Sequence, residues 1–110
     1  MKYRENTMYV CGMDHLEIFK ALSNQSRLQI LNWLKEPAIN FPEQTERLDQ
    51  GVCVGQIHKK LSLTQSTVSE YLSILQRAGL VTSTRIGKWT YYKRNEEVFL
   101  ALGNLIQNDI

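Results

Sequence analysis

The apolar positions between Thr64 and Gly79 recur at helical spacing, so this stretch predicts an amphipathic helix with one buried face. Thr64 suits the N-cap, because its hydroxyl can accept a hydrogen bond from a free amide of the first turn. Gly79 suits the position just past the helix end, where the left-handed conformation is easily reached only by glycine. The buried stripe is predicted to consist of Val68, Leu72, Leu75 and Ala78.

The front of this helix is polar but almost uncharged, which is unusual for a solvated face. Solvated helix faces usually carry Lys and Glu, whereas the side chains here are short and both donate and accept hydrogen bonds. They are Gln65, Ser66, Thr67 and Ser69. Such side chains at a helix N-terminus suit the reading of base edges in a DNA major groove, so the stretch is predicted to be a recognition helix.

The segment before the recognition helix predicts a second, shorter helix. Val54, Ile57 and Leu61 mark one apolar face, and Ser62 and Leu63 form a short link to Thr64. Two helices joined by a turn of this length form a helix-turn-helix.

The segment after the recognition helix predicts a β-hairpin. Residues 81–86 are rich in β-branched side chains and indicate a strand. Gly87 and Lys88 suit a two-residue turn, and residues 89–93 form the returning strand. A hairpin in this place is the wing of a winged helix. The predicted fold is therefore mainly α with a β-hairpin wing, an α+β winged helix-turn-helix.

Basic charge is concentrated in the same region. Between Asp49 and Glu96 the only acidic residue is Glu70, although the whole chain has a net charge of only +2. The basic residues of this interval are Lys59, Lys60, Arg77, Arg85, Lys88, Lys93 and Arg94. A solvated basic face is a common alternative, and charge alone does not decide. Its agreement with the helix-turn-helix and the wing favours double-stranded DNA as partner, with salt-sensitive binding.

The rest of the chain is expected to form an N-terminal arm over residues 1–13 and one domain over residues 14–110, because 110 residues provide one modest core. A first helix is predicted from Asp14, and a second from Ser26 as N-cap. Their inward residues are predicted to be Leu16, Phe19 and Leu22 in the first, and Leu28, Leu31 and Leu34 in the second. Arg27 is interpreted as a solvated or helix-bridging cation.

Residues 36–51 are predicted to form a long loop, since Pro37 and Pro42 break helices. Loops of this length are usually functional or disordered, so the loop is either a partner site or a mobile connection. Phe41 is expected to anchor it to the domain.

The final segment, residues 96–110, predicts a helix with an apolar stripe. The stripe consists of Val98, Leu102, Leu105 and Ile106, widened by Phe99. Packing on its own domain is one interpretation. Because the domain already has a core, the stripe also suits a surface between subunits.

Several classes of protein are not favoured by the sequence. No apolar run reaches membrane-spanning length, no signal-peptide pattern opens the chain, and two distant cysteines do not form a disulfide framework. A cytoplasmic protein without a membrane partner is therefore expected. We see no nucleophile–base pair, phosphate loop or plausible carboxylate pair, so we predict that the protein is not an enzyme and needs no cofactor.

Three motifs resemble the ArsR/SmtB-like family of bacterial winged-helix repressors. Residues 21–31 (ALSNQSRLQIL) resemble its second-helix signature, residues 63–72 its recognition helix, and residues 78–81 with 87–92 its wing. The resemblance covers roughly residues 14–105. Gln25 stands where the family more often has proline. The family implies a homodimer through the first and last helices, and therefore a near-palindromic operator.

The family's sensor sites are only partly matched. Arsenic- and metal-sensing members carry two cysteines one residue apart; here Cys53 matches the first, but Gly55 occupies the second place. Cys53 is most simply a structural residue. A thiol-redox switch with Cys11, or a metalloid site formed by the same pair, remains as an alternative. The family's zinc site on the last helix is not expected, because residues 96–110 contain no histidine and His15 and His58 are isolated, so no metal is predicted.

Roles on DNA can be predicted residue by residue. Gln65 is the candidate for a bidentate contact to adenine, and Glu70 either accepts from a cytosine amino group or pairs with Arg77 or Lys59. Tyr71 is either a phosphate contact or a half-buried helix residue. The complete predicted interface is Lys59, Lys60, Thr64, Gln65, Ser66, Thr67, Ser69, Glu70, Tyr71, Arg85, Lys88 and Arg94, with Trp89, Tyr91 and Tyr92 as the packing face of the wing.

The sequence therefore predicts a dimeric winged-helix transcriptional regulator, a repressor of ArsR-like type without the usual metal sites and with an unknown inducer. A repressor that responds through Cys11 and Cys53 is one alternative. A winged helix that binds another protein instead of DNA is the alternative from a different class.

Overall fold

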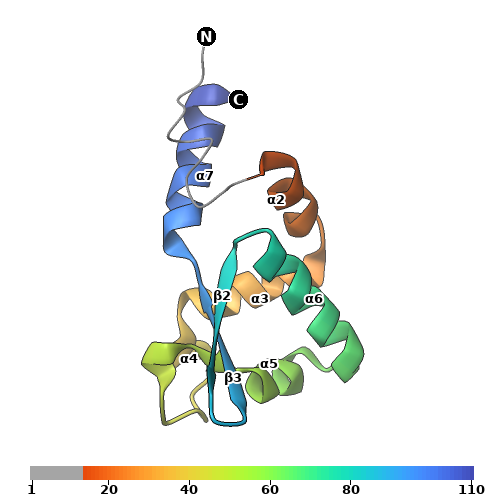
Figure 1. The fold of residues 1–110 in the computed structure, drawn as a ribbon, viewed down its shortest axis with the longest axis vertical. Coiled ribbons are helices and arrows are strands. Elements are labelled where there is room, and N and C mark those ends of the chain that lie inside the picture. Colours follow the sequence, from red (N-terminus) through yellow and green to blue (C-terminus); the bar gives the residue numbers. More distant parts are fainter. Residues whose placement is uncertain (1–13) are drawn as a thin grey trace.

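A computed structural model of the chain describes residues 14–110. The predicted arm and Cys11 lie outside this range. Figure 1 shows the elements in chain order. They are α2 (His15–Leu22), α3 (Gln25–Lys35), α4 (Pro37–Asn40), the 3₁₀ helix η2 (Leu48–Gln50), β1 (Val52–Cys53), α5 (Val54–Leu61), α6 (Gln65–Arg77), β2 (Val81–Ile86), β3 (Trp89–Arg94) and α7 (Glu96–Asp109).

The winged helix-turn-helix architecture is confirmed. The sheet is antiparallel with strand order β1-β3-β2, and the wing is the β2–β3 hairpin, in which Ile86 pairs with Trp89 across the two-residue turn. In Figure 1 the tip of the wing points to the lower end of the molecule, while α2 and α7 lie at the upper end. No helix of the described range is long and apolar enough to cross a membrane.

The recognition helix α6 is fixed by its buried stripe and by both of its ends. Val68, Leu72 and Leu75 are at most 1% exposed, as predicted. At the start, Thr64 Oγ1 accepts from Thr67 N at 3.2 Å. At the end, Gly79 has φ +81°, and the amides of Gly79 and Leu80 donate to Gln76 O and Leu75 O. This pair of bonds is a Schellman motif, so the helix stops where glycine permits the left-handed turn.

The first two helices differ from the sequence-based prediction in their inward residues. Helix α3 begins at Gln25, because the Asn24 side chain caps it by accepting from Arg27 N at 2.9 Å. The prediction of Ser26 as N-cap is therefore wrong. The predicted inward positions are also partly wrong, because Leu16 is 62% and Leu28 46% exposed. The buried residues of the two helices are Ile18, Ala21, Ile30, Leu31 and Leu34.

The segment from residue 36 to 51 is more ordered than the predicted loop. Pro37 opens the short helix α4, where its missing amide is not needed. Phe41 is 3% exposed and packs edge-on against Trp33, with ring centroids 6.2 Å apart. The expectation that Phe41 anchors this segment is confirmed.

Strand β1 was not predicted, because the segment before the recognition helix shows only the apolar spacing of a helix, at Val54, Ile57 and Leu61. Val52 and Cys53 instead pair with Tyr92 and Tyr91 of β3. On the outer edge of β1, the Gln44 side chain donates to Gly51 O at 2.9 Å and accepts from Cys53 N at 2.8 Å. One side-chain amide thereby satisfies the backbone groups that an additional strand would otherwise pair with.

Two glycines on either side of β1 provide a test of this geometry. Gly51 has φ +127°, and a Cβ there would lie 2.6 Å from Tyr92 O, whereas a Cβ at Gly55 would meet nothing within 4 Å. Gly51→Ala should lower the free energy of unfolding by about 2–4 kcal/mol, through backbone strain and the clash. Gly55→Ala should raise it by up to about 1 kcal/mol, because alanine favours the helix. Urea denaturation of both variants measures the difference, and equal stabilities would contradict the β1 geometry.

Candidate DNA-binding interface

The front of α6 presents side chains that the protein itself does not use. Gln65, Ser66, Ser69 and Glu70 are exposed. Within residues 14–110, the side chains of Gln65, Ser69 and Glu70 make no hydrogen bond or ion pair, and Ser66 makes only a long contact of 3.4 Å to Thr64 Oγ1. Since the stripe on the other side is buried, the orientation of α6 holds these groups toward solvent.

The two threonines at the helix start have a different role. Thr64 Oγ1 donates to Thr67 Oγ1 at 2.8 Å in addition to accepting from the amide of Thr67. Their hydroxyls are therefore engaged in capping the helix. They remain near the front of α6 but are less available to DNA than the free side chains beside them.

Arg27 lies on α3 and connects the end of α2 with α6. Its Nε donates to Ala21 O at 2.7 Å and its NH2 to Lys20 O at 3.1 Å, where α2 ends. The amide of Ser23 also donates to Lys20 O, and the guanidinium adds two further donors to these last carbonyls, so it stabilises the end of α2. The same group lies 5.4 Å from the centre of the Tyr71 ring. The helix-bridging interpretation of Arg27 is confirmed, and Tyr71 is half-buried on α6.

Two lysines near the end of α5 flank a hollow of 320 Å³ between α5 and the segment after α4. Lys59 forms an ion pair with Glu43 at 3.0 Å, although both side chains are well exposed. Lys60 Nζ lies 5.1 Å from the Trp33 ring centre and 5.8 Å from that of Phe41. Both cations are accessible from solvent and held by weak contacts.

Glu70 does not form either of the predicted ion pairs. Lys59 pairs with Glu43, and Arg77 NH1 donates to Ser73 Oγ at 3.0 Å. That part of the prediction is wrong, because each cation has a nearer partner. The free carboxylate of Glu70 lies on the exposed face of the recognition helix.

The wing carries cations at its tip and is tied to α6 at its base. Gly87 has φ +63°, which lets the turn close, and Arg85 Nε donates to Gly87 O at 3.1 Å. At the base, Gln76 Nε2 donates to Ser83 Oγ at 3.0 Å. The position of the wing is therefore coupled directly to the last turn of the recognition helix.

The three aromatic residues of β3 were predicted to form one packing face, and this is only partly correct. Tyr91 is buried and Tyr92 half-buried, and burial raises the pKa of Tyr92 above its ordinary value of 10.0. Trp89, in contrast, is 50% exposed. Strand β1 borders β3 only at Tyr91 and Tyr92, so nothing from β1 covers the beginning of β3.

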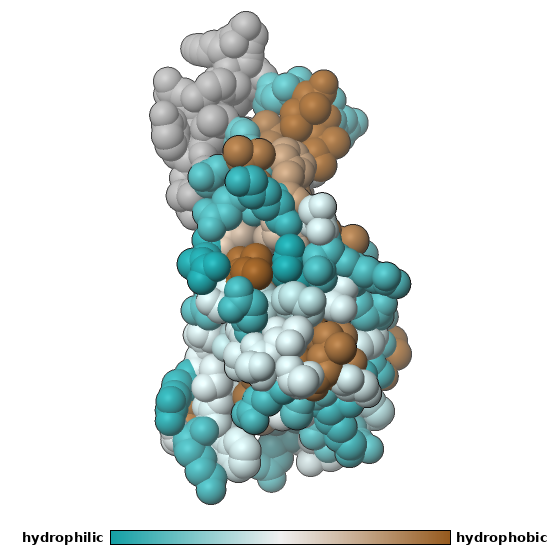
Figure 2. All heavy atoms as spheres, turned by 90° about the vertical axis from the view of Figure 1, so that its right-hand side faces the viewer, coloured by the Kyte–Doolittle hydropathy of each residue, from teal (hydrophilic) through white to brown (hydrophobic). Residues whose placement is uncertain are grey.

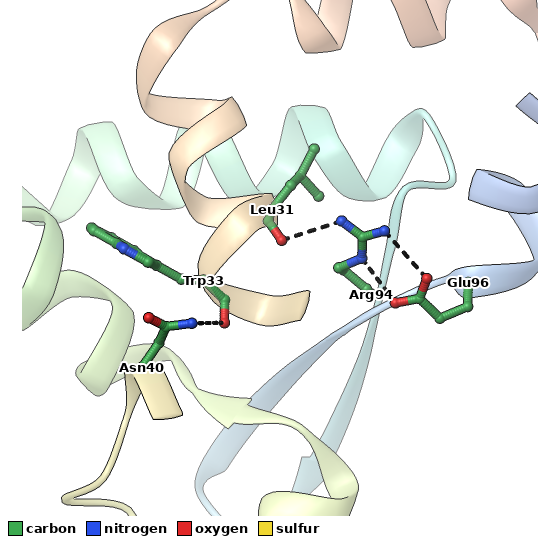
Figure 3. Close-up of polar contacts among 5 residues, drawn as sticks. All are labelled: Leu31, Trp33, Asn40, Arg94 and Glu96. Atoms are coloured by element: carbon green, nitrogen blue, oxygen red, sulfur yellow. Dashed lines mark hydrogen bonds and ion pairs between the residues drawn. The ribbon is translucent and has the colours of Figure 1, made fainter. Parts of the chain in front are cut away.

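Arg94 is the clearest departure from the predicted interface (Figure 3). Its Nε and NH2 donate to the two carboxylate oxygens of Glu96 at 2.8 and 3.2 Å, and its NH1 donates to Leu31 O at 3.4 Å. The guanidinium also lies 3.7 Å from the Phe99 ring centre. Its side chain is only 11% exposed, so it joins β3, α3 and α7 and is not available to phosphates.

Cys53 is half-buried at the junction of β1 and α5 and forms no disulfide. Its proposed partner Cys11 lies outside the described residues, so the thiol and metalloid alternatives stay untested. Within residues 14–110, no three side chains of His, Cys, Asp or Glu come together as a metal site.

Comparison with known proteins agrees with this geometry. Residues 48–83, which contain α5 and α6, match the model of "Bacterial regulatory protein, arsR family". The uncharacterized HTH-type transcriptional regulator YbzH of Bacillus subtilis strain 168 is 55% identical over 101 residues, which are 89% of this chain and 100% of that protein. The chain belongs to the arsR family.

Other members of the arsR family extend the comparison. The putative arsenical resistance operon repressor ArsR2 of Halobacterium salinarum is 32% identical over 90 residues, 82% of this chain and 66% of that protein. A homodimeric winged helix-turn-helix DNA-binding domain of Mycobacterium bovis, solved by NMR, is 28% identical with a TM-score of 0.59, over 86% of this chain and 78% of that one. The chain is thus a DNA-binding transcriptional regulator of the arsR family, and not an enzyme.

Arg94 provides a test that separates structural from interfacial cations. Arg94→Ala should lower the free energy of unfolding by about 2 kcal/mol, because it removes the charge-assisted hydrogen bonds to Glu96 and the hydrogen bond to Leu31 O. Arg94→Lys should also destabilise, since lysine keeps the charge but not the planar fork. For both variants, the dependence of DNA affinity on salt should equal that of the parent. If either variant instead keeps the stability of the parent and shows a smaller dependence of DNA affinity on salt, Arg94 is part of the DNA interface.

Proposed function

We propose that this protein is a repressor that binds a near-palindromic operator as a homodimer, acting in the cytoplasm where chromosomal DNA is accessible. The observation that carries the proposal is the set of free polar side chains on the front of α6, flanked by cations of the wing and of α5. Gln65 inserts into the major groove and makes a bidentate contact, most readily to adenine. Ser66 and Ser69 add hydrogen bonds to bases or phosphates.

The surrounding residues supply affinity that does not depend on sequence. Lys59, Lys60, Arg85 and Lys88 neutralise phosphates and release counterions. Glu70 accepts from a cytosine amino group, since its two predicted protein partners are engaged elsewhere. The hydroxyls of Thr64, Thr67 and Tyr71 contact the backbone at the edge of the site. Arg94 is not part of the proposed interface.

The dimer is supported by apolar side chains that the protomer leaves exposed. Leu16 on α2 is 62% exposed, and Leu100 and Ile106 on α7 are 70% and 50% exposed. Figure 2 shows apolar surface at the upper end of the molecule, where Figure 1 places α2 and α7. Fully burying one leucine or isoleucine is worth about 1.5–3 kcal/mol, so pairing these helices with a second copy is favourable. A dimer formed through α2 and α7 also leaves both wings and both recognition helices on the side away from the contact between the subunits.

A pair of substitutions tests the recognition helix and the wing separately. Gln65→Ala should lower the preference for operator over scrambled DNA by about 1–3 kcal/mol, because one base contact is lost. Lys88→Ala should weaken binding to both DNAs alike. It should also reduce the slope of log K against log salt concentration by about the amount that one phosphate contact contributes. Fluorescence anisotropy with DNA from upstream of the protein's own gene, at several salt concentrations, measures both effects.

The same titration, run reduced and oxidised, distinguishes the thiol alternative, because binding lost only on oxidation would make Cys53 part of a switch. In vitro transcription from that DNA distinguishes repression from activation. If the parent protein does not prefer the operator to scrambled DNA, or if it raises transcription, the proposal fails as stated.

The dimer surface is tested by placing charge on it. The double variant Leu100→Glu, Ile106→Glu should sediment as a monomer and lose at least about tenfold in operator affinity, because each half-site then binds alone. Both side chains are exposed in the protomer, so its circular dichroism spectrum should not change. Ile39→Glu is the matched control, since Ile39 is 71% exposed on α4. A double variant that still sediments as a dimer would refute this surface.

A further inference from the structure

Trp89 is the most exposed aromatic side chain of residues 14–110, with 50% of its surface accessible to solvent. It is the first residue of β3 and pairs with Ile86 next to the turn of the wing. Alternation along the strand places it on the same face as Tyr91, which is buried. The wing therefore presents a large apolar ring at its tip, beyond the part of β3 that β1 covers.

The surroundings of Trp89 are cationic. Lys88 Nζ lies 5.3 Å from the ring centre, and Arg85 is held in the same turn by its bond to Gly87 O. No acidic residue occurs between residues 81 and 95. A partner for this tip must therefore combine negative charge with apolar surface at short range, and the walls of a DNA groove, with phosphates beside deoxyribose carbons, have this combination.

Stabilisation of the hairpin does not account for the exposed surface of the Trp89 ring. Trp89 has one cross-strand neighbour, Ile86, and one cation beside it, and half of its surface remains in water after both contacts. Residues that only stabilise a hairpin bury their apolar surface, as Tyr91 does.

We propose that Trp89 is a DNA-contacting residue of the wing, whose indole packs against deoxyribose in the minor groove while Lys88 and Arg85 contact the adjacent phosphates. The inference rests on the proposed function, because it requires the wing to lie on DNA. Apolar side chains are established contacts in the minor groove, and narrow grooves attract cations such as those beside Trp89. The contact adds affinity that does not depend on ions, which separates it from the lysine and arginine contacts.

The first experiment is a series of anisotropy titrations with operator DNA at three salt concentrations. Trp89→Ala should weaken binding about tenfold at every concentration, so that the slope of log K against log salt equals that of the parent. Trp89→Phe should weaken it by about threefold, because part of the ring surface is kept. Ile39→Ala, which trims an exposed apolar residue outside the wing, should bind as the parent does.

The second experiment uses the fact that the chain has only two tryptophans. In Trp33→Phe, Trp89 is the only tryptophan. Its emission should shift to shorter wavelength, and its quenching by acrylamide should fall, when operator is added. If Trp33→Phe does not fold, the same protection is measured in the parent protein, and its loss in Trp89→Phe assigns it to the wing.

The outcomes of these experiments distinguish a failure of the inference about Trp89 from a failure of the proposed function. If Trp89→Ala binds like the parent while Gln65→Ala loses its sequence preference, the inference is wrong and the ring serves a different partner. If Trp89→Ala weakens binding but DNA does not protect the Trp89 emission, the residue acts only through hairpin stability, and the inference is again wrong. If the parent shows no operator preference, the proposed function itself fails.

Discussion

The burial of one stripe of α6 is the constraint on which the rest of the structure depends. Because Val68, Leu72 and Leu75 are at most 1% exposed, α6 cannot rotate about its axis without exposing apolar surface. The orientation of the polar front is thus set by hydrophobic packing and not by any contact that the front itself makes. The protein can leave Gln65 and Ser69 without internal partners, since the helix is stable without them.

The elements around α6 are joined by side chains that donate to backbone carbonyl groups and, in the case of Arg94, also to a carboxylate. Arg27 closes the end of α2 and contacts the ring of Tyr71, and Arg94 connects the end of β3 to α3 and to the start of α7. Gln44 completes the edge of β1 in the same way. The bonds of Arg27 lie at the end of a helix, and those of Gln44 lie on a sheet edge that no other strand pairs with. These bonds therefore link the α2–α7 end of the molecule to the recognition helix and the wing.

The recognition helix and the wing could be predicted from the sequence because their signals are local: a period of 3.6, a capping threonine, a terminal glycine and a two-residue turn. Strand β1 could not be predicted, because two residues contain no period and its pairing partner lies some forty residues further along the chain. The role of Arg94 was missed for a related reason, as its contacts with Leu31 and Phe99 arise only in the folded protein. Sequence reasoning treated all cations of the region alike, since it had no measure of exposure.

Exposure divides these cations into two groups with different tasks. Arg94 is 11% exposed and bound bidentately to Glu96, so moving it onto a phosphate would break these bonds and its bond to Leu31 O. Lys59 is exposed together with its partner Glu43, and an exposed ion pair contributes at most about 1 kcal/mol. Lys60 and Lys88 lie over aromatic rings, again at exposed positions. Such contacts restrict where the ammonium groups lie without holding them strongly. An approaching phosphate therefore meets cations that are already positioned and whose weak contacts within the protein break at a small cost in free energy. The counterions released from DNA contribute a much larger favourable free energy of binding.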